Sequence, residues 1–247
     1  MLRDAQLNRL TRLFRRASAD YRLLEDGDHI LAGLSGGKDS LALVELLGRQ
    51  ASIFVPRIKV TALHVRVRER NYKSDIHYLQ HHCEKFGVQL LVRDTDILPI
   101  ENAKEKDPCF LCSWYRRKVL FDVAQEIGCN KIALGHHRDD ILETLLMNTV
   151  FQGTFSSMPP KLQMNKMPLE IIRPLCLIDE DDIRTYAELT GYQQQTVLCP
   201  YEHTSSRTDA HQWMKHLQRI NPDIKSSLWH ALRVREQDCI DRLPRSR

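Results

Sequence analysis

The stretch from His29 to Ser40, H-I-L-A-G-L-S-G-G-K-D-S, decides the fold. Residues 29–34 form an apolar run of strand length, and the apolar residues after Ser40 recur with the spacing of an amphipathic helix. The glycines fall in the turn between the two. Such a turn presents backbone N–H groups at a helix N-terminus, and glycine lets an anion approach the backbone closely. The stretch therefore predicts a strand–turn–helix unit that binds phosphate.

The same alternation of short apolar runs and helical segments continues outward along the chain. It predicts an α/β fold: a doubly wound, mostly parallel sheet flanked by helices, with an N-terminal helix and a C-terminal helical segment. The expected strands are 29–35, 58–66, 88–94, 131–135 and 169–175. The expected helices are 4–24, 39–49, 74–86, 112–127, 138–150, 179–189, 205–220 and 222–238. Residues 95–111 and 152–168 are expected to be irregular.

Composition limits the class of protein. Hydrophobic residues make up 42% of the 247 residues, which suits a folded chain rather than a disordered one. Apolar runs long enough to span a bilayer and a secretory leader are not found, so we expect a cytoplasmic protein that does not bind membranes. The seven cysteines should stay reduced in that compartment, so paired cysteines indicate metal or redox ligands rather than disulfides. The net charge of +4 neither requires nor opposes nucleic-acid binding.

The loop is not the usual one of nucleoside triphosphatases. That motif needs glycine at position 32 and Ser or Thr at position 39, where this sequence has Ala32 and Asp39. S-G-G-K-D-S instead resembles the PP-loop of the ATP pyrophosphatase superfamily, which splits ATP between its α and β phosphates. The resemblance implies ATP binding by these six residues: Ser35, Gly36, Gly37, Lys38, Asp39 and Ser40.

The chemistry of that cleavage suggests roles for individual side chains. Lys38 would stabilise the leaving pyrophosphate, and Asp39 would hold Mg²⁺ against the phosphate oxygens. His64, at the end of the next strand, is the expected neighbour of the adenine ring, although a histidine there is often only structural.

Two further motifs accompany the loop. Cys109 and Cys112 form a C-x-x-C at the start of a helix, where two thiols share a metal, form a redox pair or simply pack. The other cysteines are isolated, and Cys199, before Pro200, is the best presented for coordination. G-H-H-R-D-D-I-L-E-T at 135–144 is a second strand end that enters a helix. It is either a helix with an acidic first turn or, at the same sheet edge as the loop, a means of placing Asp139 or Asp140 near bound ATP.

Together these motifs resemble the bacterial tRNA 2-thiocytidine synthetases in order and spacing. M-P-P-K-L at 158–162 and I-R-P-L at 172–175 belong to the same match, which spans roughly residues 25 to 220. The resemblance implies an enzyme that adenylates the C2 carbonyl of a cytidine in the tRNA anticodon loop and replaces its oxygen with sulfur. It assigns Lys38, Asp39 and Asp140 to catalysis, adds Gly135 to the ATP site, and maps a 4Fe–4S cluster onto Cys109, Cys112 and Cys199. Partners are then tRNA and a cysteine desulfurase or another sulfur donor.

This resemblance divides the chain into three parts: an N-terminal amphipathic helix (1–24), a PP-loop ATP pyrophosphatase domain carrying the three-cysteine site (25–200) and a C-terminal helical extension (201–247). Many family members have a further cysteine where this chain has Glu202. That departure weakens a persulfide relay through the extra thiol but leaves the three cluster ligands. Arg116, Arg117 and Lys118 either meet RNA phosphates or form ordinary surface charge.

Other interpretations remain open. The chain is also compatible with a PP-loop ligase resembling the tRNA lysidine synthetases, with the cysteines holding a structural zinc ion. A third possibility is an ATP-binding RNA adaptor without turnover. The apolar stripe on residues 7–21 packs either within the chain or across a homodimer.

Overall fold

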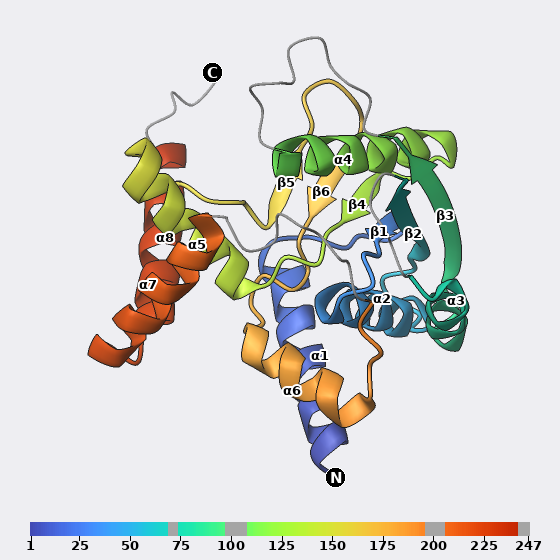
Figure 1. Ribbon diagram of the computed structural model, residues 1–247, viewed down its shortest axis with the longest axis horizontal. Helices are drawn as coiled ribbons and strands as arrows, with labels where there is room; N and C mark the ends of the chain where they lie inside the picture. Colours follow the sequence, from blue (N-terminus) through green and yellow to red (C-terminus); the bar gives the residue numbers. More distant parts are fainter. Residues whose placement is uncertain (69–73, 97–107, 196–205, 242–247) are drawn as a thin grey trace. The chain divides into compact units, whose positions relative to one another are not determined.

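A computed structural model of the chain, shown in Figure 1, describes residues 1–68, 74–96, 108–195 and 206–241. It forms two compact units. The first unit comprises Met1–His137 and Pro160–Tyr201, and the second comprises Arg138–Pro159 and Glu202–Arg247. The three-part division expected from the sequence stays a prediction.

The first unit is built on a six-stranded sheet with the order β3-β2-β1-β4-β6-β5. All neighbouring strands are parallel except β5, which runs antiparallel to β6. The strands are β1 (His29–Gly33), β2 (Lys59–Val67), β3 (Gln89–Thr95), β4 (Lys131–Ala133), β5 (Lys161–Gln163) and β6 (Glu170–Ile172). The predicted α/β fold with a mostly parallel sheet is confirmed.

Helices cover both faces of this sheet. They are α1 (Leu2–Asp20), α2 (Lys38–Ala51), α3 (Ile76–Lys85), α4 (Pro108–Glu126) and α6 (Glu180–Thr190). In Figure 1, α4 lies above the sheet, and α1, α2, α3 and α6 lie below it. Val123 and Ala124 of α4 pack with Leu31, Leu63 and Ile132 of the strands in a buried core. Burial of this apolar surface holds the layers together.

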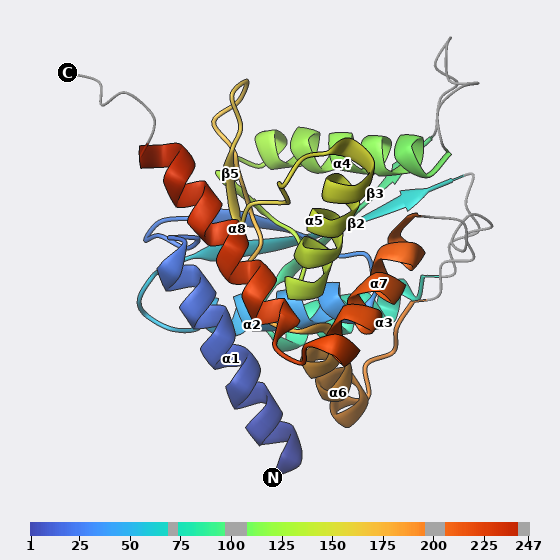
Figure 2. The ribbon, with the colours of Figure 1, turned by 90° about the vertical axis from the view of Figure 1, so that its left-hand side faces the viewer.

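The second unit contains three helices: α5 (Arg138–Gln152), α7 (Ser206–Ile220) and α8 (Ile224–Asp241). Each contacts the other two, as Figure 2 allows the reader to follow. The rings of Phe151 on α5 and Trp213 on α7 lie 5.8 Å apart. Among the described residues, none of the helices is both long and apolar enough to cross a membrane.

Some element boundaries differ from the sequence prediction. Helix α4 begins at Pro108 rather than at 112, since proline is well suited to the first helical position, where no N–H bond is needed. Helix α1 ends at Asp20 rather than at 24, and Arg22 has a φ of +48°. Residues 152–168 were expected to be irregular, which is wrong for 161–163, because pairing with β6 creates β5 there.

The N-terminal apolar stripe packs within the chain at three of its positions. Leu10, Phe14 and Ala17 are buried, and α1 contacts α6. The stripe thus has a partner inside the first unit, whereas a homodimer stays a prediction.

Candidate active site

The candidate site lies beside β1, where the order in which the chain adds strands to the sheet reverses. The chain runs from β1 outward through β2 to β3 and then returns to β4 on the other side of β1. Ligands of open α/β sheets bind at such a switch point, outside the carboxyl ends of the strands. The turns that follow β1 and β4 both open there, since Ala32 is paired with Ala133 near the two strand ends.

The turn after β1 is organised around the hydroxyl of Ser40. This oxygen accepts hydrogen bonds from the N–H of Gly36 and the hydroxyl of Ser35, each at 3.1 Å, and donates to the carbonyl of Gly37 at 2.9 Å. Gly36 has a φ of +90°, which glycine adopts without strain, and Gly37 is the N-cap of α2. The first-turn N–H groups of α2 have no intrahelical partners, so the loop presents them as anion donors.

Lys38 lies between two carboxylates. Its ammonium is 3.2 Å from Asp39 Oδ2 and 3.0 Å from Glu180 Oε1, the first residue of α6. Burial disfavours the ammonium, but Asp39 and Glu180 outweigh burial, and the pKa of Lys38 is raised. His137, after β4, has its Nε2 3.9 Å from Asp39 Oδ1. The turn is therefore a cluster of mixed charge beside a helix N-terminus.

Gly135 brings the second turn against the first. A Cβ atom at this position would lie 3.3 Å from the carbonyl carbon of Asp39 and 3.4 Å from the N of Ser40. These distances are shorter than most Cβ contacts, so a side chain here would require the Asp39 backbone to shift by a few tenths of an ångström, and glycine avoids this. The structure thus brings Gly135 together with the loop, as expected from the sequence, while its contact with ATP stays a prediction.

His64 is fully buried beneath the loop. Its Nδ1 donates to the carbonyl of Leu34 at 2.7 Å, which leaves Nε2 to accept from the hydroxyl of Ser74 at 3.0 Å. Burial lowers the pKa of this imidazole, so the ring is neutral at physiological pH. These contacts give His64 a structural role at the end of β1, and its predicted contact with adenine is not tested by them.

Glu180 was not expected as a site residue. In the sequence, Glu180 is one of several acidic residues in the first turn of α6. Such residues are common at helix N-termini and do not by themselves indicate a functional site. Its contact with Lys38 depends on the tertiary packing of α6 against α2.

The acidic residues of the second motif lie in the second unit, at the start of α5. Asp139 Oδ1 is 2.5 Å from the ammonium of Lys225 on α8, and both side chains are nearly buried. Glu143 accepts a hydrogen bond from His211 on α7 at 2.7 Å. Burial is the main reason that the pKa of Glu143 is raised. Nothing in the sequence indicated that Lys225 and His211 would contact these acidic residues. The role of Asp140 stays a prediction.

The cysteine motif begins α4. Cys109 lies in the first turn, and Cys112, which is half-buried, follows one turn later. Because α4 crosses over from β3 to β4, its N-terminus lies at the carboxyl edge of the strands, the edge that carries the loop. Cys199 lies outside the described residues. Within the described residues, three potential metal ligands do not come together.

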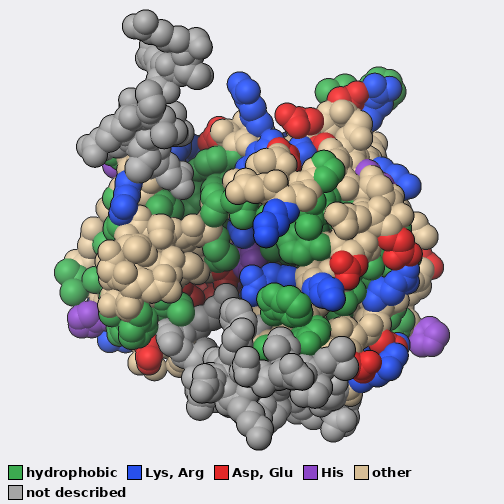
Figure 3. Space-filling model, turned by 90° about the horizontal axis from the view of Figure 1, so that it is seen from above, with side chains coloured by type: hydrophobic (Ala, Val, Ile, Leu, Met, Phe, Trp, Pro, Cys, Tyr) green, Lys and Arg blue, Asp and Glu red, His purple; other side chains and the backbone are tan. Residues whose placement is uncertain are grey.

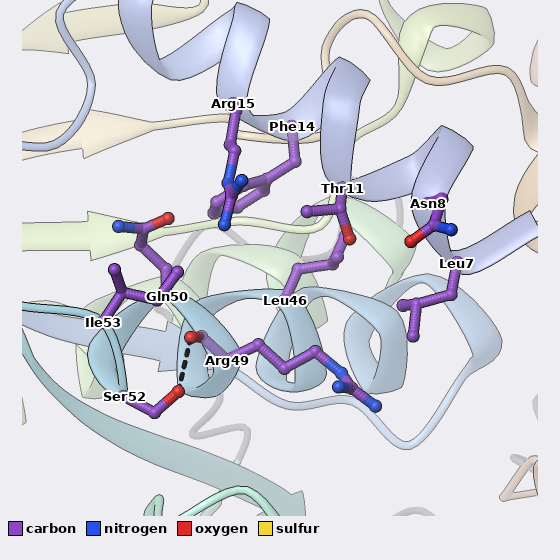
Figure 4. A pocket seen from close by; sticks show the side chains of 10 residues that line it. All are labelled: Leu7, Asn8, Thr11, Phe14, Arg15, Leu46, Arg49, Gln50, Ser52 and Ile53. Atoms are coloured by element: carbon purple, nitrogen blue, oxygen red, sulfur yellow. Dashed lines mark hydrogen bonds between the residues drawn. The ribbon is translucent and has the colours of Figure 1, made fainter. Parts of the chain in front are cut away.

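A separate cavity of about 280 Å³ lies between α1 and the C-terminal half of α2. Figure 4 shows Phe14 and Arg15 of α1 opposite Leu46 and Arg49 of α2. The loop lies at the other end of α2, so this cavity is not the candidate active site. Basic side chains are distributed over the face seen in Figure 3, interspersed with hydrophobic ones, rather than gathered in one patch.

Comparison with known proteins identifies the family. A model of the PP-loop domain matches residues 6–196. A tRNA-cytidine(32) 2-sulfurtransferase from Syntrophotalea carbinolica is 35% identical over 240 residues, covering 94% of this chain and 91% of its own. The enzyme of the same name from Anaeromyxobacter dehalogenans is 36% identical over 235 residues, with 92% and 80% covered.

Solved structures agree with the fold. The U34-tRNA thiolase NcsA from Methanococcus maripaludis, solved with its [4Fe-4S] cluster, matches with a TM-score of 0.78 at 24% identity and covers 98% of this chain and 81% of its own. An NH3-dependent NAD synthetase from Campylobacter jejuni matches with a TM-score of 0.50 at 13% identity, with 97% and 98% covered. The fold, the loop at the switch point and the sequence matches together show that this chain belongs to the PP-loop family and, within it, to the tRNA-cytidine(32) 2-sulfurtransferases.

Proposed function

We propose that this protein replaces the C2 oxygen of a cytidine in tRNA with sulfur, at position 32 as in its named relatives. The observation that carries the proposal is the placement of Lys38. Its ammonium lies in the PP-loop, at the N-terminus of α2 and at the switch point of the sheet. This is an arrangement suited to a pyrophosphate leaving group.

The first step is adenylation. The C2 carbonyl oxygen attacks the α phosphorus of ATP, a new P–O bond forms, and the bond to the bridging oxygen breaks to release pyrophosphate. The first-turn N–H groups of α2 and the ammonium of Lys38 stabilise the charge that develops on the leaving group. Asp39 is the residue we assign to Mg²⁺, since hard carboxylate oxygens suit this ion, and Asp140 is assigned to catalysis.

The second step uses the activated carbon. Hydrosulfide adds to C2, the C2–O bond breaks, and AMP leaves with the oxygen, while the sulfur loses its proton to solvent. This step, which starts from hydrosulfide, consumes no oxidant or reductant. Gly135 and the Ser35–Ser40 loop hold the nucleotide, so the same turns serve both steps.

Cys109, Cys112 and Cys199 are the residues we assign to a 4Fe–4S cluster. What supports this assignment is the spacing of the two cysteines in the chain, because positions 109 and 112 are about one turn apart near the start of α4. Three thiolate ligands would leave one iron open to bind sulfur. A cysteine desulfurase is the donor class we propose for that sulfur. It delivers the sulfur as a persulfide, so a thiol reductant must supply two electrons to release it as hydrosulfide.

Mass spectrometry of tRNA nucleosides tests the function. A strain that lacks the gene should lose 2-thiocytidine, and the wild-type gene should restore it. Lys38→Ala should lower tRNA-dependent pyrophosphate release by about 100-fold or more and fail to restore the nucleoside. Lys59→Ala, at an exposed lysine of β2, is the matched control and should restore it. An unchanged 2-thiocytidine content in the deletion strain would refute the proposal.

Metal analysis tests the cluster separately. Protein purified without oxygen should contain iron and acid-labile sulfide, and Cys112→Ser should lose both. Zinc without sulfide would instead favour the ligase interpretation.

A further inference from the structure

A short segment after α6, residues 192–195, lies directly on the PP-loop. The N–H of Gln195 donates to the carbonyl of Gly36 at 2.9 Å. A Cβ atom at Gly36 would lie only 2.5 Å from Cγ of Gln195, so the glutamine side chain packs closely on the loop backbone. Both residues belong to the first unit. The segment thus holds the loop through a hydrogen bond and through close packing.

The carbonyl that Gln195 holds belongs to a peptide unit between two glycines. This unit joins Gly36, whose φ is +90°, to Gly37, whose φ is −76°. Because neither residue has a side chain, a half-turn of the peptide unit between them meets little steric resistance. The planar trans peptide directs the N–H of Gly37 opposite to the carbonyl of Gly36. A half-turn would therefore put an acceptor where the donor had been.

The orientation of this peptide unit decides whether it attracts or repels an anion. With its carbonyl directed at Gln195, the N–H of Gly37 points away from that residue, and its nitrogen lies 3.4 Å from Oγ of Ser35. Gly37 is the N-cap of α2, so its N–H is one of those that the helix leaves without an intrahelical partner and that suit a phosphate. In the opposite orientation, the negative end of the carbonyl dipole would face the phosphate.

The side-chain amide of Gln195 fixes its own backbone in place. Its Oε1 accepts from the N–H of Asp75, the N-cap of α3, and its Nε2 donates to the carbonyl of Gln193 at 3.0 Å. The N–H of Gln193 in turn donates to the hydroxyl of Tyr78 on α3 at 3.0 Å. Two hydrogen bonds to the start of α3 therefore limit the movement of the N–H that holds the loop.

The start of the segment is anchored as well. Tyr192 donates its hydroxyl to Glu45 on α2 at 2.6 Å, and its N–H bonds to the carbonyl of Ala187 on α6 at 3.0 Å. Glu45 is almost fully buried and also accepts from Tyr186 at 2.6 Å. Since the segment is bonded to α2, α3 and α6, Gln195 has a fixed place beside the loop.

We propose that Gln195 is a positioning residue that holds the Gly36–Gly37 peptide in the orientation that binds the pyrophosphate part of ATP. The inference rests on the proposed function, in which the loop holds ATP while pyrophosphate leaves. Two glycines let a phosphate approach the loop closely, but they leave this peptide unit without steric control of its own. If the competent orientation is only partly populated, the affinity for nucleotide falls by that fraction.

The first test measures the affinity for phosphate ligands without tRNA. Calorimetry gives Kd for α,β-methylene-ATP and for inorganic pyrophosphate. Gln195→Pro removes the N–H and should weaken both by about fivefold or more, the effect of one hydrogen bond. Gln195→Ala keeps the N–H but loses its anchor, and should weaken both by about twofold. Gln194→Pro and Gln194→Ala, at an exposed neighbour in the same segment, are the matched controls and should bind as wild type.

The second test observes the peptide unit itself. The chain has ten glycines, so protein made with ¹⁵N-labelled glycine gives a simple amide spectrum, in which Gly37 is assigned by comparison with Gly37→Ala. Wild type should give one sharp Gly37 signal that shifts when pyrophosphate is added. Gln195→Pro should give a signal that is split or broadened by exchange between two orientations, whereas loss of packing alone would leave it single and sharp.

The inference is overturned by unchanged affinities in Gln195→Pro, by an equal loss in Gln194→Pro, or by a single sharp Gly37 signal in Gln195→Pro. A wild-type protein that binds neither ligand would also overturn it. Because both tests omit tRNA, a protein that binds nucleotide as expected but forms no thiolated nucleoside would refute the proposed function alone.

Discussion

Lys38 owes its geometry to a residue that is distant in sequence. Glu180 holds one side of its ammonium and Asp39 the other, so the amine cannot turn away from the α2 N-terminus without losing an ion pair. Burial opposes the ionisation of Glu180, but Lys38 outweighs it and keeps the pKa of Glu180 below its ordinary value of 4.5. The stabilisation by the pair is therefore complete above that pH and is lost as the pH falls through the lowered pKa of Glu180.

Glu180→Gln should lower tRNA-dependent pyrophosphate release by about tenfold, because the ammonium loses its fixed position. The effect should be in kcat more than in KM for ATP. Glu188→Gln, at an exposed position of the same helix, is the control. Equal rates in the two variants from pH 6 to 8 would show that Glu180 does not position Lys38.

The cysteines differ sharply in their surroundings. Burial raises the pKa of Cys83 and Cys176 to about 12 and that of Cys129 to about 11, whereas Cys112 is only half-buried. Since the thiolate is the reactive form, the three buried thiols are protonated and inert at pH 8.

Iodoacetamide should therefore modify Cys112 of the cluster-free protein at least about tenfold faster than Cys83, Cys129 or Cys176 at pH 8. Peptide mass spectrometry gives the rates, and urea-unfolded protein, in which all seven cysteines should react, is the control. Modification of Cys129 as fast as Cys112 would contradict the burial seen here.

Among the elements, β4 depends on a buried charge. The ammonium of Lys131, the first residue of β4, lies 2.9 Å from Asp28, 3.0 Å from Glu25 and 3.4 Å from Glu170. Burial disfavours this ammonium, but Asp28 and Glu25 outweigh it and raise the pKa of Lys131. The stabilisation is complete below its ordinary value of 10.5 and is lost only as the pH rises through the raised pKa.

Lys131→Met should lower the free energy of unfolding by about 3–5 kcal/mol, because the buried Asp28 carboxylate loses its cation. Lys161→Met is the matched control. Lys161 also pairs with Glu170, at 3.0 Å, but is more exposed, and its loss should cost about 1 kcal/mol or less. Urea unfolding at pH 7 measures both, and similar losses in the two variants would contradict the assignment.

The elements also show what sequence can and cannot predict. The strands of the parallel core were found because each contains a short apolar run between segments with helical spacing. Strand β5 was missed because Lys161 to Gln163 contain one apolar residue after two prolines, and the strand exists only through pairing with β6. In the site, the loop and Gly135 were predicted from local motifs. Glu180 and Gln195 were not, because their contacts arise only when α6 and the segment after it fold onto α2 and the loop.

At the scale of the whole molecule, the net positive charge is small for a chain of 247 residues. With a net charge of +4, affinity for tRNA must come from local basic residues, and three of them follow one another on α4. Each phosphate contact releases counterions and steepens the dependence of affinity on salt.

Arg117→Gln should reduce the slope of log Kd for tRNA against log salt concentration by about 0.7–0.9, if this side chain meets one phosphate. Arg3→Gln, at an exposed position of α1, is the control and should leave the slope unchanged. Filter binding between 50 and 200 mM salt, roughly the range over which such slopes are measured, gives the values. Identical slopes for the wild-type protein and Arg117→Gln would show that Arg117 does not contact an RNA phosphate.

The two units interleave along the chain, and this has a consequence for synthesis. Helix α5 leaves the ribosome before β6 and α6, although it packs with α7 and α8, which are made after them. Domains generally fold as units during synthesis. The sheet can thus close once Thr190 has emerged, whereas α5 stays without its partners α7 and α8 until those two helices have been synthesised. A nascent chain paused in this interval is the form of the protein most exposed to chaperones and proteases.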